Sequence, residues 1–255
     1  MRKYFASVLI VSLFIGLAFA SAPITKAKDK KPDIPEKELE KIVFIHYKKP
    51  AKHPCNNDGV CDADEKPSCA DCKNGSGSKK ESSCYKFIGR NVKWRWTEDF
   101  VVSTSLSPNQ STIDTSANTW DEQVPFDIFA DISRVGDYPW GVYDYNNSIS
   151  FGDYPEENVI AVTAIWWSPP LKAIVEYDIM FDTDFAWGNA TIDATLMDLQ
   201  NIATHEFGHG AGMDDLYDGA CIDETMYGYS NYGETKKRDL HTGDITGIKE
   251  LYSRK

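Results

Sequence analysis

Hydrophobic and polar positions along the chain predict strands in its first part and helices in its second. The sequence over 92–96 alternates with period two, as a strand with one buried face does. Apolar runs predict further strands at 126–132 and 159–166, and a short apolar stretch at 42–45 is compatible with another. At 175–181 the alternation predicts one buried face and one acidic face, with the apolar positions Val175, Tyr177, Ile179 and Phe181.

Helical spacing dominates two other parts of the chain. Ser107 and Pro108 are typical of a helix start, and the helix is expected to run to about Glu122. A second helix is predicted by apolar residues that recur every three or four positions, namely Ile192, Leu196, Leu199, Ala203 and Phe207. Since strands come first and helices follow, the order predicts an α+β domain rather than a parallel βαβ array.

The 255 residues suffice for one well-buried domain and a smaller appendage. We expect residues 84–255 to form the main domain. Lys, Glu, Asp and Pro dominate the early chain, which predicts a propeptide or linker over 23–54. A small Cys-rich segment is expected over 55–72. Glycine and serine then predict a flexible tether over 73–83.

The first residues are typical of an export signal. Arg2 and Lys3 precede an uncharged apolar run, and small residues at 18–20 or 20–22 offer cleavage sites. We therefore expect residues 1–22 to be a removed signal peptide and the protein to be secreted. The alternative is an uncleaved anchor that holds the protein at the cell surface, because about 20 apolar residues can span a bilayer.

Export would place the six cysteines where disulfides persist. Four are grouped closely enough to pair among themselves: Cys55, Cys61, Cys69 and Cys72. This leaves Cys84 and Cys221 as expected partners. In the alternative, Cys84 joins the upstream group and Cys221 stays free or pairs between molecules.

The acidic and amide residues between the four grouped cysteines suit Ca²⁺. Two disulfides with solvated acids are the favoured interpretation, because no full calcium-loop pattern is present. A zinc site made of four thiolates is the third alternative and is less suited to an extracellular protein.

The formal net charge of -12 argues against nucleic acid as a partner. Binding of a polyanion rests on clustered Lys and Arg that release counterions. A membrane partner is expected only if residues 1–22 stay uncleaved, and no pattern indicates an oligomeric state.

The strongest chemical signal is the pair His205 and His209 with Glu206 between them. On a helix the two imidazoles lie one turn apart on a shared face, where they can bind one zinc ion, and Glu206 can reach water beside it. The alternative is a pair of solvated histidines. A chance H-E-x-x-H would arise in roughly one shuffled chain in 200 of this composition.

Gly212 and the residues after it extend this pattern. A helix ending shortly after His209 needs a residue that takes the left-handed conformation, and glycine does so without steric cost. The turn would bring Asp215 back as a third metal ligand, with Asp214 as the fallback. Three protein ligands leave the fourth position of zinc open, as in catalytic rather than structural sites.

The stretch from His205 to Asp215 resembles the metzincin signature H-E-x-x-H-x-x-G-x-x-H, which a Met-turn follows. Aspartate replaces the last histidine here, as it does in snapalysin-like metzincins. The resemblance implies that Met226 forms an apolar floor beneath the metal. The alternative is a methionine that only fills a gap in the core.

Within the metzincins the chain is similar to matrixins over Cys84 to Tyr252. The resemblance rests on 240–252, similar to the closing helix of matrixins with Asp244 near its start. It implies a twisted, mostly parallel sheet with an antiparallel edge strand at 158–166 that receives substrate by strand addition. The histidine-bound second zinc and the cysteine switch of matrixins have no counterpart in this sequence.

The resemblance therefore implies a secreted zinc metalloendopeptidase that acts on proteins or peptides, with one catalytic Zn²⁺. His205, His209 and Asp215 would bind the metal, and Glu206 would act as general base. The alternative function is a non-catalytic, metal-stabilised extracellular binding or adhesion module. Glu206 counts against it, because a purely structural metal site needs no base.

Overall fold

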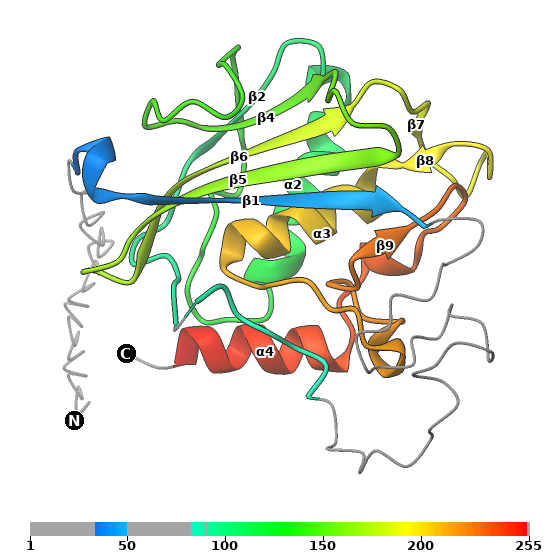
Figure 1. Cartoon of the computed structure of the whole chain (residues 1–255). Helices are drawn as coiled ribbons and strands as arrows, with labels where there is room; N and C mark the ends of the chain where they lie inside the picture. Colours follow the sequence, from blue (N-terminus) through cyan, green and yellow to red (C-terminus); the bar gives the residue numbers. More distant parts are fainter. Residues whose placement is uncertain (1–33, 50–82, 90, 254–255) are drawn as a thin grey trace, which may run out of the picture.

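A computed structural model describes residues 34–49, 83–89 and 91–253, and it places helices beneath one face of a twisted sheet (Figure 1). The sheet has seven strands in the order β3-β2-β4-β6-β5-β1-β9. In that order they are Arg134–Val135, Phe100–Val102, Asn147–Gly152, Ala173–Asp182, Val159–Ser168, Glu40–Lys48 and Tyr229–Ser230. A second, two-stranded sheet pairs β7 (Trp187–Gly188) with β8 (Met197–Asp198).

Most neighbouring strands in the large sheet are parallel. β5 is antiparallel to both of its neighbours, β6 and β1, and the other neighbouring strands of the sheet are parallel. The predicted α+β class and mostly parallel sheet are thus confirmed. The strand expected at the edge, β5, carries β1 on its outer side over a register from Glu40↔Trp167 to Tyr47↔Val159.

Three α-helices complete the described fold: α2 (Gln110–Asp121), α3 (Leu199–Ala211) and α4 (Thr242–Ser253). Four short 3₁₀ helices accompany them: η1 (Glu36–Glu38), η2 (Ser107–Asn109), η3 (Gly219–Cys221) and η4 (Lys236–Arg238). The expected helix from Ser107 is η2 followed directly by α2, and the expected closing helix is α4.

Helices α2 and α3 pack on each other under the sheet (Figure 1). The indole Nε1 of Trp120 in α2 donates to the Thr204 carbonyl of α3 at 2.8 Å. On the sheet side, Phe207 packs against Phe100 and Phe129 with ring centroids 5.3 and 5.1 Å apart. The apolar face of α3 is therefore fixed in the core, which sets the direction of its other faces.

The predicted apolar stripe began too early. Ile192 is 84% exposed and precedes the helix, which starts at Leu199. The side chain of Asp198 accepts a hydrogen bond from Asn201 N at 2.9 Å and so caps the helix at that point. The pattern of apolar spacing alone does not detect such a cap.

Two predicted strands are wrong. Residues 92–96 form only an isolated bridge at Lys93, and residues 126–132 only one at Phe129. The buried side chains in these stretches, such as Trp94, lie in irregular segments that cover the core. Trp94 Nε1 donates to the Gly210 carbonyl at 2.7 Å, so tertiary packing rather than a strand ladder explains the alternation.

The acidic face predicted for 175–181 is also buried. Glu176 and Asp178 of β6 are at most 1% exposed. Their carboxylates accept backbone N–H groups from the loop that covers them: Glu176 binds Asp144 N at 3.0 Å, and Asp178 binds Gly141 N at 2.8 Å. Burial raises the pKa of Asp178 to about 6. The alternation of apolar and acidic side chains is present, but the acidic side chains hold a loop instead of facing solvent.

A disulfide joins Cys84 to Cys221 across 137 positions of sequence. Cys55, Cys61, Cys69 and Cys72 lie outside the described residues, as do the expected signal segment at 1–22 and the whole calcium hypothesis for 55–72. Of the expected propeptide or linker, the structure describes 34–49. Within the described part of the chain, no helix is long and apolar enough to cross a membrane.

Candidate metal centre

Helix α3 places His205 and His209 one turn apart, with ring centroids 4.8 Å from each other. Both side chains are at most 1% exposed. The helix ends at Gly212, which has φ +105°. A Cβ atom there would lie 2.6 Å from the Val92 carbonyl oxygen, so both the turn and its packing require glycine.

The turn at Gly212 brings Asp215 back to the two histidines. Asp215 Oδ1 lies 3.3 Å from His205 Nε2 and 3.5 Å from His209 Nε2. The neighbouring Asp214 instead forms an ion pair with Lys86 at 2.8 Å. The structure thus places Asp215, and not Asp214, next to His205 and His209.

The three atoms that face one another fit a metal ion. Within the described part of the chain, His205 Nε2, His209 Nε2 and Asp215 Oδ1 are buried without a hydrogen-bond partner. Their three side chains also form one of the groups with ligand atoms all within 4.8 Å of one another. Buried polar atoms without partners are costly, and a cation among them removes that cost. Two imidazoles and one carboxylate with an open fourth position are a donor set for catalytic zinc.

Backbone carbonyls fix the orientation of both rings. His205 Nδ1 lies 2.7 Å from the Thr225 carbonyl oxygen, and His209 Nδ1 lies 3.0 Å from that of Met213. In neutral rings each Nδ1–H donates to its carbonyl, which leaves the Nε2 lone pair for a metal. Burial lowers the pKa of His205 to about 4. Burial also lowers the pKa of His209, but the Asp215 carboxylate outweighs burial, so the pKa of His209 is raised overall.

Met226 packs against α3 below the histidines. A Cβ at Gly208 would lie 2.2 Å from Met226 Sδ. Met226 can therefore pack against the helix only because residue 208 has no side chain. Asp244, in the first turn of α4, accepts Thr225 N at 2.7 Å and Met226 N at 3.2 Å. The buried Asp244 carboxylate therefore holds the segment whose Thr225 carbonyl orients His205.

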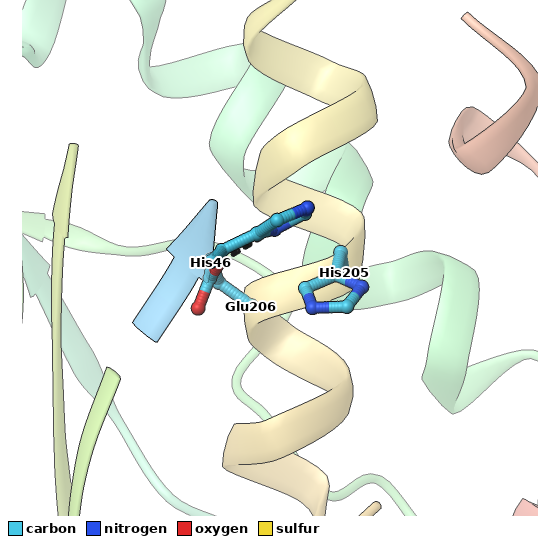
Figure 2. A group of neighbouring side chains, drawn as sticks. All are labelled: His46, His205 and Glu206. Carbon is cyan, nitrogen blue, oxygen red and sulfur yellow. Dashed lines mark hydrogen bonds and ion pairs between the residues drawn. The ribbon is translucent and has the colours of Figure 1, made fainter. Parts of the chain in front are cut away.

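Glu206 is fully buried, and both of its carboxylate oxygens have partners. Oε2 accepts from Thr163 Oγ1 of β5 at 2.6 Å, and Oε1 lies 3.1 Å from His46 Nδ1 of β1 (Figure 2). Burial raises the pKa of Glu206 to about 7. A carboxyl group with a pKa near neutral pH can accept and return a proton.

Strand β1 lies directly over the histidines. The Phe44 ring stacks on His209 with centroids 4.0 Å apart and planes 12° apart. The His46 ring lies beside His205 with centroids 4.0 Å apart (Figure 2). Burial, then the nearby His205 and Lys237, hold the pKa of His46 well below its ordinary value. A neutral His46 thus donates from Nδ1 to Glu206.

The sequence patterns missed His46, Thr163 and the holding role of Asp244. His46 is a polar residue directly after the apolar stretch 42–45, which is the one local signal that it faces a polar site. Thr163 lies inside an apolar strand and gives no signal, because the pairing of β5 with α3 is not visible in either segment alone.

A family model described as Matrixin, Peptidase M10, matches residues 97–253. No curated protein matches the chain. The matched stretch contains the whole of the histidine and aspartate centre, Glu206 and Met226, and it leaves out β1.

Proposed function

Since this chain belongs to the matrixin family and is a zinc metalloendopeptidase, we propose that it is secreted and hydrolyses peptide bonds with Glu206 as general base. His205, His209 and Asp215 would hold the metal. The observation that carries this assignment is the convergence of three buried polar atoms without other partners among the described residues. The family leaves no support for a non-catalytic binding module.

Zinc bound at these residues supplies a Lewis acid that polarises the scissile carbonyl and acidifies water. Glu206 then takes a proton from the attacking water and returns it to the leaving nitrogen. Thr163 orients this carboxylate through Oε2. The other oxygen, Oε1, is the one that His46 occupies, so Glu206 becomes free to act when His46 leaves.

We also propose that β1 belongs to a propeptide that keeps the enzyme latent. In matrixins, substrate pairs as an added strand with an edge strand that corresponds to β5 here. In this chain β1 is already paired along β5. Phe44 and His46 cover the two metal-binding histidines. The position of β1 before residues 84–255 supports this role, since a propeptide precedes the domain that it inhibits.

Secretion is supported by the export signal in 1–22 and by the Cys84–Cys221 disulfide, which is typical of oxidising compartments. The domain boundaries that we propose are those of the sequence: signal 1–22, propeptide 23–54, Cys-rich segment 55–72, tether 73–83 and catalytic domain 84–255.

The mechanism is tested in the full chain opened by Phe44→Ala and His46→Ala, with a denatured fluorescent protein as substrate. Adding Glu206→Gln should leave zinc bound, since Glu206 is not a ligand, but reduce turnover by at least about a hundredfold. The matched control is Glu157→Gln, which changes an exposed carboxylate and should leave turnover unchanged. Zinc content by mass spectrometry and turnover are measured together. Retained turnover in the Glu206→Gln protein would exclude this mechanism.

A further inference from the structure

Lys237 is a fully buried lysine next to the metal centre. It lies in η4 and its side chain reaches under β1. Its Nζ donates to the Tyr227 carbonyl oxygen and lies 3.4 Å from His46 Nε2. The side chain that covers Lys237 therefore belongs to β1, the strand that occupies the place of substrate.

Lys237 Nζ contacts a carbonyl oxygen and an imidazole. Among the described residues Lys237 takes part in no ion pair, although its charge is buried. Burial lowers its pKa to about 8, so it stays mostly protonated at neutral pH. The carboxylates of Glu234, Asp215 and Glu206 favour this charge from beyond ion-pair distance. A buried charge that forms no direct ion pair is costly.

A second donor group lies on a residue that contacts Lys237. Asn201 Oδ1 accepts Lys237 N at 2.8 Å, which places the two residues side by side. The Nδ2 group of Asn201 is buried and has no hydrogen-bond partner within the described part of the chain. Asn201 lies one turn before His205 on α3, so this donor is next to the metal centre. We call these two adjoining donor residues, Lys237 and Asn201, the floor.

The ligand that satisfies such a floor is an anion with two oxygens. With β1 in place, Lys237 Nζ meets the imidazole of His46, whose Nε2 can accept one hydrogen bond. A carboxylate at that place would accept from Lys237 Nζ, would supply a counter-charge, and would leave a second oxygen for the Asn201 donor. Glutamate fits the reach better than aspartate, since its carboxylate oxygens lie as many bonds from Cα as the Nε2 atom of histidine does.

We propose that Lys237 and Asn201 select an acidic side chain, with glutamate preferred, at the substrate position that His46 occupies in β1. This rests on the proposed function, because it takes β1 to lie as substrate does. His46 contacts Glu206, so the selected residue adjoins the scissile bond.

The floor is tested first without catalysis, through the thermal unfolding of the full chain. His46→Glu and His46→Gln are compared in the native background and in the Lys237→Met background. Both substitutions remove the imidazole, and Glu206 repels the introduced carboxylate in both backgrounds, so the difference between backgrounds isolates Lys237. The glutamate should gain at least about 2–4 °C over glutamine only where Lys237 is present. An equal difference in both backgrounds would overturn the proposal.

The second measurement maps cleavage sites in a proteome-derived peptide library, using the full chain opened by Phe44→Ala and His46→Ala. Acidic residues should be enriched at one position adjoining the cleaved bond. Lys237→Met should remove the enrichment and Lys237→Arg should keep it. The control Lys236→Met, at a lysine that contacts Ile222 and Asp223, should leave the enrichment unchanged.

The outcomes distinguish a failure of the proposed role of Lys237 from a failure of the proposed peptidase function. Cleavage without acidic enrichment, or enrichment that Lys237→Met leaves intact, overturns the role of Lys237 and leaves the peptidase function standing. Lack of cleavage by every opened protein, with zinc bound, overturns the proposed function and the selectivity that rests on it.

Discussion

Asp215 and Asp214 are adjacent in sequence but have opposite environments, and this difference decides which of them can serve the metal. Asp215 is 8% exposed and faces His205 and His209, and Tyr217 Oη donates to its Oδ2 at 3.2 Å. Asp214 pairs with Lys86 near the surface. In the proposed metal centre, Asp215 alone of the two would supply both the negative charge and the third donor.

Asp215→Ala should weaken zinc binding by more than the roughly 10–100-fold typical of losing a group that only supports a ligand. Asp214→Ala, the matched control, should leave zinc affinity unchanged because its carboxylate faces Lys86. Competition with a fluorescent zinc chelator measures both affinities. If the alanine at 214 proved the more harmful of the two, the ligand assignment would be off by one residue.

Residue types in the zinc motif were predictable because their spacing on one helix turn is local. His46 and Lys237 were not, since they meet only when β1 and η4, 191 positions apart at these two residues, converge. Nothing in the sequence near Lys237 distinguishes it from its partly exposed neighbours Lys236 and Arg238. A buried lysine becomes visible only once the surrounding packing is known.

At the scale of elements, the end of α3 depends on one glycine. In Gly212→Ala, the new Cβ would approach the Val92 carbonyl oxygen to 2.6 Å and the residue would keep φ +105°. Such strain costs about 1–3 kcal/mol, so the unfolding midpoint should fall by at least about 3 °C. Gly210→Ala is the control, because a Cβ there makes ordinary contact with the Tyr177 ring at 3.4 Å. Calorimetry of the two proteins compares them directly.

Strand β1 presents two faces, and only one should matter for latency. Phe44→Ala with His46→Ala removes the side chains that cover the histidines, so the full chain should gain at least about tenfold in peptidase activity, or about 1.4 kcal/mol of weakened inhibition. Val43→Ala, at a residue 40% exposed in the same strand, should leave the activity unchanged. Rates on an unstructured protein substrate give the comparison. Equal rates for the wild-type and doubly substituted chains would show that β1 does not inhibit.

Elements with strong local patterns were predicted well, and those shaped by tertiary contacts were not. The helix from Ser107, strand β5 and helix α4 follow their patterns closely. Residues 92–96 alternate as a strand does, yet Trp94 is held by a hydrogen bond to α3. Periodicity reports which side chains are buried, and it does not report whether the backbone beside them finds a strand to pair with.

At the scale of the whole molecule, the Cys84–Cys221 bond ties the start of the main domain to the segment before Met226. Glu224 N donates to the Cys221 carbonyl oxygen at 3.0 Å. The disulfide is therefore linked by a hydrogen bond to the segment that leads to Met226. The pairing was expected from the count and grouping of cysteines. The pairing of β1 with β5 was not expected, because no local sequence signal shows which of two distant segments pair as strands.

Replacing both Cys84 and Cys221 with serine should lower stability by about 4–5 kcal/mol, as expected for a closed loop of 137 residues. The unfolding midpoint should then fall by roughly 10 °C. Zinc affinity should also fall, since the segment that carries the Thr225 carbonyl loses its anchor. Thermal unfolding and zinc competition test the two effects separately. A midpoint within about 2 °C of the wild type would show that the bond constrains little.

The attachment of β1 to the chain that it covers has a consequence for how activation responds to dilution. While residues 50–82 remain uncut, β1 meets its place beside β5 at an effective concentration in the millimolar range, whatever the protein concentration. A cut in that stretch turns the same contact into an encounter between two molecules. In the proposed secreted enzyme the freed strand would then be lost by dilution, and a reversible contact would become a one-way switch.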